Sequence, residues 1–129
     1  MTMPARRIGI DVVPLSRVRE LVAQDAEPAL RRMLSSAELL SSSTQDGPDL
    51  AGIAGRLAAK EAVFKLFHVG GQPVPWLSTE VLKSDGGWPV VRLTGRAARL
   101  AREAGLGEIE ISITHDDAYA IAVAVSAAD

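Results

Sequence analysis

Two carboxylates stand in segments that are otherwise mostly apolar. Asp11 lies in RIGIDVV (7–13), and Glu61 lies in LAAKEAVFKLF (57–67). At about 100° per residue, Glu61 falls near the centre of one helical stripe. The other members of that stripe are Leu50, Ile53, Ala54, Leu57, Phe64 and His68. A buried carboxylate without a partner is costly, so we expect Glu61 to be protonated, ion-paired or bound to a metal.

Each of these polar residues also has a plain structural interpretation. Lys65 follows Glu61 by four residues, so the two could form an ordinary helical ion pair. Asp11 could face outward from an edge strand. His115, at the end of ISIT, could be a hydrogen-bonded structural histidine. The individual residues therefore do not choose between structure and function.

Considered together, these residues favour one kind of site. Two carboxylates and His115 could form a transition-metal centre. Two carboxylates without further imidazole suit a hard cation better, because Mg²⁺ binds one or two carboxylates and completes its shell with water and phosphate oxygens. Lys65 and Arg56 would then contact phosphate. The residue chemistry indicates a Mg²⁺–phosphate site and leaves the substrate open.

The elements that must position these residues follow from the apolar patterns. We expect strands at 7–13, at 108–114 and at 118–125, and a further strand pair around the turn Ser84–Gly87. Helices are expected at 15–24, at about 27–34, at 49–68 with Asp49 as N-cap, and at 95–104 capped by Thr94. Ser35 and Glu38 have the spacing of a capping box. This order of elements predicts an α+β domain.

The last apolar segment alternates bulky and small side chains. Its small members are Ala120, Ala122 and Ala124, and its bulky members are Tyr119, Ile121, Val123 and Val125. A strand face made of alanines lets a helix approach closely. We therefore expect the helix at 49–68 to pack on this face.

Composition limits the class of protein. The chain has 129 residues, 47% of them hydrophobic, which fits a single domain over 1–129. There is no cysteine, no apolar run of membrane-spanning length and no signal-peptide core, so we expect a cytoplasmic protein without a membrane partner. The net charge of −2 argues against a nucleic-acid partner. Basic residues gather in the first quarter, where they form either an ordinary surface or a patch for an acidic partner: Arg6, Arg7, Arg17, Arg19, Arg31 and Arg32.

Three motifs in this order resemble one family over nearly the whole chain. They are GIDVVPLSRV (9–18), AGRLAAKEAVFKLF (54–67) and ISITHDDAYAIAVAV (111–125), and the segment GWPVVRLTGRA adds to the likeness. The chain resembles the holo-(acyl-carrier-protein) synthases, the short type of 4′-phosphopantetheinyl transferase. The resemblance implies an α+β fold with a long helix packed on a small antiparallel sheet. It also implies a homotrimer with active sites between subunits.

The family's activity implies roles for particular residues. Such enzymes move the phosphopantetheine arm of coenzyme A to a serine of an apo acyl carrier protein, of fatty-acid or polyketide type, and release adenosine 3′,5′-bisphosphate. By motif, Asp11 and Glu61 would bind Mg²⁺, with Glu61 also the candidate general base. The remaining assignments are Lys65 to the pyrophosphate, Arg56, Pro89 and His115 to coenzyme A, and Arg17 to the acidic helix of the carrier, with Arg31 or Arg32 extending that surface.

Departures from the family pattern leave two rival interpretations open. Pro14 stands where a glutamate is frequent, and Phe64 stands where a small polar residue is frequent. Asp116, after His115, could tune the histidine or cap the turn, and we favour the turn. One rival is an inactive member that binds its partner without transfer. The other is a small oligomeric binding module, for which Glu61→Ala would leave Mg²⁺ and coenzyme A binding unchanged.

Overall fold

The computed structural model describes residues 6–23 and 27–128. Its helices are α1 (Leu15–Ala23), α2 (Glu27–Met33), α3 (Ser36–Ser41), α4 (Leu50–Lys65), the 3₁₀ helix η1 (Trp76–Ser78) and α5 (Gly95–Glu103). Its strands are β1 (Arg6–Pro14), β2 (Ser43–Thr44), β3 (Gly47–Pro48), β4 (Thr79–Lys83), β5 (Pro89–Leu93), β6 (Leu106–His115) and β7 (Tyr119–Ala128). The predicted α+β class is confirmed, and β2 and β3 form a short antiparallel pair of their own.

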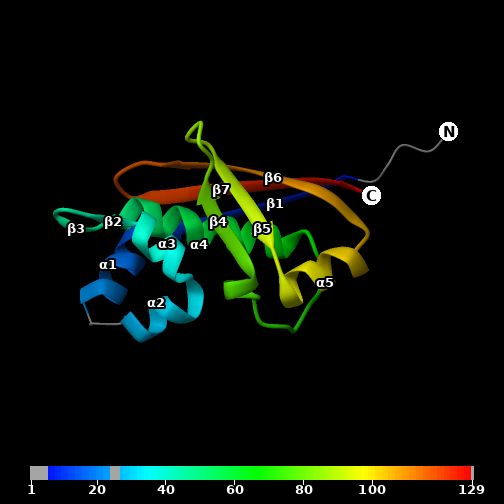
Figure 1. The fold of residues 1–129 in the computed structure, drawn as a ribbon, viewed down its shortest axis with the longest axis horizontal. Coiled ribbons are helices and arrows are strands. Elements are labelled where there is room, and N and C mark those ends of the chain that lie inside the picture. Colours follow the sequence, from blue (N-terminus) through cyan, green and yellow to red (C-terminus); the bar gives the residue numbers. More distant parts are fainter. Residues whose placement is uncertain (1–5, 24–26, 129) are drawn as a thin grey trace.

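A three-stranded antiparallel sheet in the order β1-β7-β6 runs along α4 (Figure 1). In its register Asp11 pairs with Ala122, and His115 pairs with Ala120. Side chains opposite one another in a sheet share a face. Both alanines are fully buried. Asp11 and His115 therefore stand on the face of the sheet that α4 covers.

Small residues allow α4 to lie close to this sheet. Ala120, Ala122 and Ala124 are fully buried, as their alternation with bulky residues predicts. On β1, a Cβ added to Gly9 would lie 2.1 Å from the carbonyl oxygen of Ala62. Any side chain at position 9 would therefore push β1 away from the helix.

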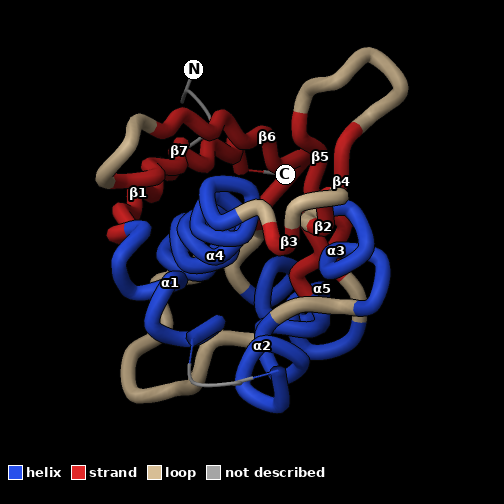
Figure 2. Tube along the Cα trace, turned by 90° about the vertical axis from the view of Figure 1, so that its left-hand side faces the viewer, coloured by secondary structure: helices blue, strands red, loops and turns tan. Residues whose placement is uncertain are grey.

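The helix α4 is the centre of the molecule and not a surface helix with one apolar stripe. Figure 2 shows it nearly end-on, with the three-stranded sheet on one side and α3 and the β4–β5 hairpin on another. Its residues from Ile53 to Lys60 are all buried. The expected single stripe is therefore incomplete, because α4 also buries Arg56 and Lys60 on a face away from the sheet.

The two ends of α4 differ in how well they match the predicted helix at 49–68. The Asp49 side chain accepts a hydrogen bond from the Gly52 N–H at 3.0 Å, as expected of an N-cap. The helix ends at Lys65, before the predicted end at His68, which is exposed and has a φ of 52°. The inclusion of His68 in the buried stripe is thus wrong.

Two further caps behave differently from one another. The capping box at the start of α3 is confirmed, because Ser35 and Glu38 exchange backbone-to-side-chain bonds of 2.8 and 3.2 Å. Thr94 occupies the N-cap position of α5, but its side chain makes no capping bond. The hydroxyl of Ser78, from η1, instead accepts a bond from the Ala97 N–H at 3.1 Å. The expected role of Thr94 is therefore taken by a residue distant in sequence.

The end of the first helix and the absence of a membrane-spanning helix are predictions that can be compared only with the described residues. The predicted end of the first helix at Gln24 lies outside the described residues. Within 6–23 and 27–128, no helix has both the length and the apolar character needed to cross a bilayer.

Candidate active site

Asp11 and Glu61 bring two carboxyl groups together between β1 and α4. Burial, a side-chain hydrogen bond with Asp11 and the negative charge of Asp11 raise the pKa of Glu61 to about 7. In the described part of the chain, no N–H or O–H group donates to the buried Oδ2 of Asp11. The pair therefore needs either a shared proton or a cation between its oxygens.

Two cationic side chains flank this carboxylate pair. Lys65 donates from Nζ to the carbonyl oxygen of Ile10 at 2.7 Å and lies 3.4 Å from Oδ1 of Asp11. Its side chain is 53% exposed, so it can also reach a ligand. The charge of Arg17, exposed on α1, acts with that of Lys65 to lower the pKa of Glu61 and so oppose part of the upward shift. Lys65 therefore forms its ion pair with Asp11 on β1. The helical ion pair with Glu61 that the spacing allowed is not found among the described residues.

The donor set fits Mg²⁺ better than a transition metal. Among the described residues, no cluster of three or more His, Cys, Asp and Glu side chains could hold a metal. The carboxylate pair supplies oxygen ligands alone, which suits a hard cation that takes its remaining ligands from water and a phosphate substrate. His115 does not join the pair as a third metal ligand.

The departures at Pro14 and Phe64 add no ligand to the pair. Pro14 is the last residue of β1 and lies opposite Tyr119 on β7. The ring of Phe64 packs edge-on against Phe67, with centroids 6.1 Å apart. Neither side chain offers a charged or hydrogen-bonding group for a cation or a phosphate.

A second set of predicted residues meets at another place. Arg56 on α4, Pro89 on β5 and His115 at the end of β6 line one pocket of about 240 Å³, together with Lys83. The Arg56 side chain is buried and donates from Nε to the carbonyl oxygen of Val81 at 3.1 Å. Its lining has three basic side chains and one carboxylate, that of the N-cap of α4, and this excess of basic groups suits an anionic ligand.

The two sets lie on different faces of α4. Glu61 follows Arg56 by five residues, which in a regular helix gives about 140° of rotation and about 7.5 Å of rise. Asp11, Glu61 and Lys65 are all absent from the lining of the pocket that holds Arg56. The described chain thus forms two half-sites and does not bring all the predicted residues to one point.

Asp116 belongs to the turn after His115. Its Oδ1 accepts hydrogen bonds from the N–H groups of Ala118 and Tyr119, each at 2.8 Å. These backbone bonds hold the pKa of Asp116 below its ordinary value. The favoured interpretation of Asp116 as a turn-capping residue is confirmed.

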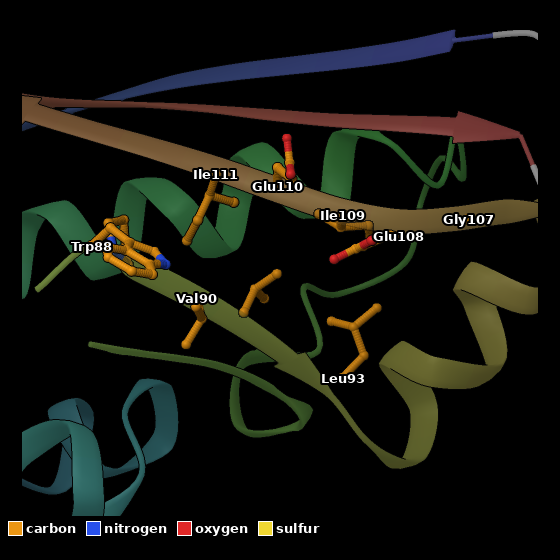
Figure 3. Close-up of a pocket in the computed structure, with 10 residues that line it drawn as sticks. Trp88, Val90, Leu93, Gly107, Glu108, Ile109, Glu110 and Ile111 are labelled. Atoms are coloured by element: carbon orange, nitrogen blue, oxygen red, sulfur yellow. The ribbon is translucent and has the colours of Figure 1, made fainter. Parts of the chain in front are cut away.

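The larger pocket between β5 and β6 has a different character (Figure 3). Its volume is about 420 Å³, and it is lined by apolar side chains such as Val90 and Ile111 with the carboxylates Glu108 and Glu110. Its lining contains no Lys, Arg or His, and of the predicted site residues only Pro89. A phosphate ligand would meet negative charge there without compensation, so the smaller pocket is the better candidate.

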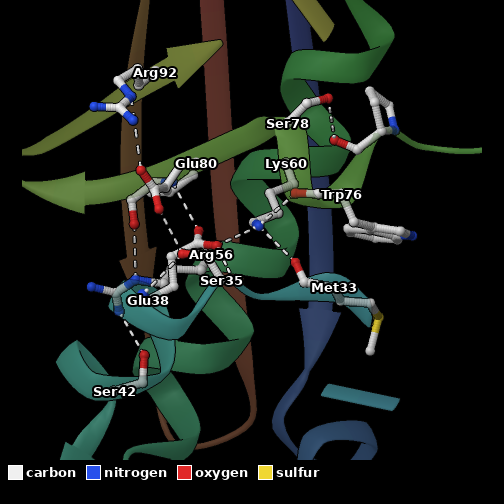
Figure 4. Close-up of polar contacts among 12 residues, drawn as sticks. Met33, Ser35, Glu38, Ser42, Arg56, Lys60, Trp76, Ser78, Glu80 and Arg92 are labelled. Carbon is white, nitrogen blue, oxygen red and sulfur yellow. Dashed lines mark hydrogen bonds and ion pairs between the residues drawn. The ribbon is translucent and has the colours of Figure 1, made fainter. Parts of the chain in front are cut away.

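Reasoning from the sequence missed a buried ion pair next to this smaller pocket. Glu38 and Lys60 lie 2.6 Å apart, and both side chains are 0% exposed (Figure 4). Two signals could have indicated it: Lys60 interrupts a run of small residues on α4, and Glu38 is the capping-box acid of α3.

Comparisons with known proteins agree with the fold and with the motifs. Residues 7–124 match the family model described as the 4′-phosphopantetheinyl transferase superfamily. A holo-(acyl-carrier-protein) synthase of Moorella thermoacetica is 39% identical over 117 residues, which cover 91% of this chain and 90% of the relative.

Solved structures give the same result. The Helicobacter pylori holo-(acyl-carrier-protein) synthase in complex with coenzyme A has a TM-score of 0.79 and 30% identity, covering 93% of this chain and 99% of that chain. The Chronobacterium ammoniagenes ACPS–CoA complex has a TM-score of 0.80 and 28% identity, and the match covers 97% of this chain and 98% of that chain. The chain therefore belongs to the 4′-phosphopantetheinyl transferase superfamily, within which sequence and fold group it with the holo-(acyl-carrier-protein) synthases.

Proposed function

We propose that this chain, as one transferase domain, moves the 4′-phosphopantetheine arm of coenzyme A to a serine of an apo acyl carrier protein. The observation that carries the proposal is the Asp11–Glu61 carboxylate pair beside Lys65, in a chain of this family. In this proposal the reaction depends on Mg²⁺ and releases adenosine 3′,5′-bisphosphate. The carrier belongs to either fatty-acid or polyketide synthesis.

The carboxylate pair would hold the cation. Asp11 acts on the pKa of Glu61 from close by, and Oδ2 of Asp11 lacks a donor in the described chain. Bound Mg²⁺ would offset negative charge on the pyrophosphate. Lys65, which is half exposed and beside Asp11, would donate to a phosphate oxygen.

The chemical step is a displacement at phosphorus. The serine oxygen of the carrier forms a bond to the phosphorus nearer the pantetheine, and the bond from that phosphorus to the bridging oxygen breaks. The serine proton would go to Glu61, the candidate general base. The leaving bisphosphate keeps the bridging oxygen, and positioning and charge supply most of the rate.

The nucleotide end of coenzyme A would occupy the pocket of Arg56, Pro89 and His115. Support comes from the basic lining and from two similar synthases whose structures were solved in complex with coenzyme A. Arg56 and His115 would contact phosphate or nucleotide atoms, and Pro89 would shape the wall.

A homotrimer would bring the two half-sites together across copies. The sheet face away from α4 is apolar on β1 and β7, with Ile8 70%, Ile10 57% and Tyr119 50% exposed. Large exposed apolar patches mark interaction surfaces. A head-to-tail interface repeated around a threefold axis closes a ring. In that ring, the carboxylate pair of one copy would face the phosphate pocket of its neighbour.

The acidic carrier would approach from α1. Arg17 is exposed there, and its charge acts on Glu61, so it lies close to the carboxylate pair. Exposed Arg31 and Arg32 on α2 would extend the same basic surface. Such a surface steers an acidic partner toward the reacting groups.

The rival interpretations lack the same support. An inactive family member would not need the two adjacent carboxylates with Lys65 beside them. A binding module would not need a phosphate pocket on one face of α4 and a carboxylate pair on another. The cytoplasmic location and the absence of a nucleic-acid partner remain predictions from composition.

Mass spectrometry of intact carrier tests the function. We would incubate the protein with coenzyme A, Mg²⁺ and apo carriers of both fatty-acid and polyketide type. The proposal predicts a phosphopantetheine adduct on the serine of at least one carrier. The absence of an adduct on every carrier would reject the transferase function.

A further inference from the structure

The buried pair of Glu38 and Lys60 takes no part in the proposed reaction, yet every donor of the lysine is satisfied. An ammonium group has three donors. Lys60 Nζ bonds to Oε1 of Glu38 at 2.6 Å and to the carbonyl oxygens of Met33 at 2.6 Å and Trp76 at 2.8 Å (Figure 4). Burial lowers the pKa of Lys60, so placing a charged lysine here costs stability.

Glu38 extends this network to β4. Its Oε2 accepts a hydrogen bond from the Val81 N–H at 2.9 Å. The carbonyl oxygen of the same Val81 accepts from Nε of Arg56 at 3.1 Å. Lys60 and Arg56 both come from α4, one turn apart, so the bonds close a ring from α4 through α3 and β4 back to α4.

The ring fixes the orientation of the Arg56 guanidinium. Its Nη1 donates to Oγ of Ser42, the C-cap of α3, at 3.0 Å. Nε and Nη1 are therefore anchored, and Nη2 has no acceptor among the described residues. A guanidinium held in this way keeps one nitrogen for an anion and loses little freedom on binding.

We propose that the Glu38–Lys60 pair is a positioning pair that sets the orientation of Arg56 and thereby the affinity for the phosphates of coenzyme A. The inference rests on the proposed function, because it takes the pocket of Arg56 to be the nucleotide site. The opposing view is that the pair only joins α2, α3 and α4, without effect on Arg56.

A double-mutant cycle separates the two views. Glu38→Leu/Lys60→Met removes both buried charges together, because removal of one partner alone would leave an uncompensated charge. Arg56→Met is then made in the wild-type chain and in this double variant. The readouts are KM for coenzyme A, kcat and the folded fraction by circular dichroism.

If the Glu38–Lys60 pair orients Arg56, the effects of the two changes on KM for coenzyme A should not be additive. Arg56→Met and Glu38→Leu/Lys60→Met should each raise KM for coenzyme A about tenfold, the loss expected for one hydrogen bond to a charged group. In the double variant, Arg56→Met should add little, because the guanidinium has already lost its anchor. The exposed pair variant Arg99→Met/Glu103→Leu is the control, in which Arg56→Met keeps its full effect.

Additive effects of Arg56→Met in both backgrounds would overturn the inference. If the double variant fails to fold, Glu38→Gln/Lys60→Met, which also removes both charges and keeps the side-chain size at position 38, replaces it in the same cycle. Failure of the proposed function would show differently, because the wild-type chain would then transfer no phosphopantetheine at all.

Discussion

The carboxyl groups of Asp11 and Glu61 lie close enough across the contact of β1 with α4 for Asp11 to help raise the pKa of Glu61 to about 7. Their approach depends on Gly9, where a Cβ would lie 2.1 Å from the carbonyl oxygen of Ala62. The close packing of strand and helix thus forces two like charges together. Such a pair is unfavourable on its own and favourable with a cation, which is the physical basis for a metal site here.

Removal of either carboxylate should abolish transfer without loss of the fold. We expect Asp11→Asn and Glu61→Gln each to lower kcat/KM by on the order of 100-fold or more, because cation binding and charge stabilisation are lost. Thermal unfolding without Mg²⁺ should show a Tm at or above that of the wild type, since the repulsion disappears. Full activity in both variants would show that the metal assignment is wrong.

The pH dependence of Mg²⁺ binding should follow Glu61. Its pKa of about 7 means that Mg²⁺ must displace a proton at lower pH. We expect the Kd for Mg²⁺, measured by calorimetry, to fall as pH rises from about 6 to about 8. We expect Glu61→Gln to bind Mg²⁺ too weakly for this comparison, so Arg102→Gln, on the distant α5, serves as the control that should keep the pH dependence.

Stability without metal should change in the opposite sense. The folded-state pKa of Glu61 lies above its ordinary value of 4.5, so the protonated form is favoured by folding. Its stabilising contribution is complete below pH 4.5 and is lost as pH rises through about 7. Metal-free wild type should therefore lose more stability over this range than Glu61→Gln. Parallel curves for the two proteins would contradict the raised pKa.

Arg17→Glu should weaken carrier recognition selectively. The side chain is exposed on α1 near the carboxylate pair, so a reversed charge would repel an acidic helix. We expect KM for the carrier to rise by about tenfold or more and KM for coenzyme A to change little. Arg102→Glu on α5 is a matched charge reversal. An equal rise of both KM values for Arg17→Glu would count against a carrier-facing role.

The apolar outer face of the sheet should control assembly. Ile10→Glu places a charge on this face, where the side chain is 57% exposed in the single chain. We expect sedimentation to show loss of the trimer and activity to fall with it. Leu40→Glu, at an exposed leucine of α3, is the control that should stay trimeric. A trimeric Ile10→Glu variant would move the interface elsewhere.

The parts of the fold predictable from sequence are those marked by a local pattern, either an alternation of side-chain size or the spacing of a helix cap. Ala120, Ala122 and Ala124 identified the face that α4 covers, and the spacing of Ser35 and Glu38 identified a cap. The burial of α4 on its other face was not predictable by periodicity. Alanine and glycine fill that helix on all sides, so no contrast marks where Arg56 and Lys60 are buried.

The candidate site was predictable residue by residue but not in its arrangement. Motif resemblance selected Asp11, Glu61 and Arg56, and the five-residue spacing of Arg56 and Glu61 places them on different faces of α4, but the spacing does not tell which other residues complete each half-site. The cap of α5 shows the same limit, since Ser78 replaces Thr94 through a tertiary contact. Spacing along the chain predicts local contacts, whereas these depend on packing.

A subunit-mixing experiment tests most directly the claim that a complete site needs two copies. Glu61→Gln damages the carboxylate pair, and His115→Ala damages the phosphate pocket, so each variant alone should be nearly inactive. Co-expressed at equal levels, they should recover about a quarter of wild-type transfer, because each mixed ring regains one intact site. Activity no greater than the sum of the separate variants would contradict a site shared between copies.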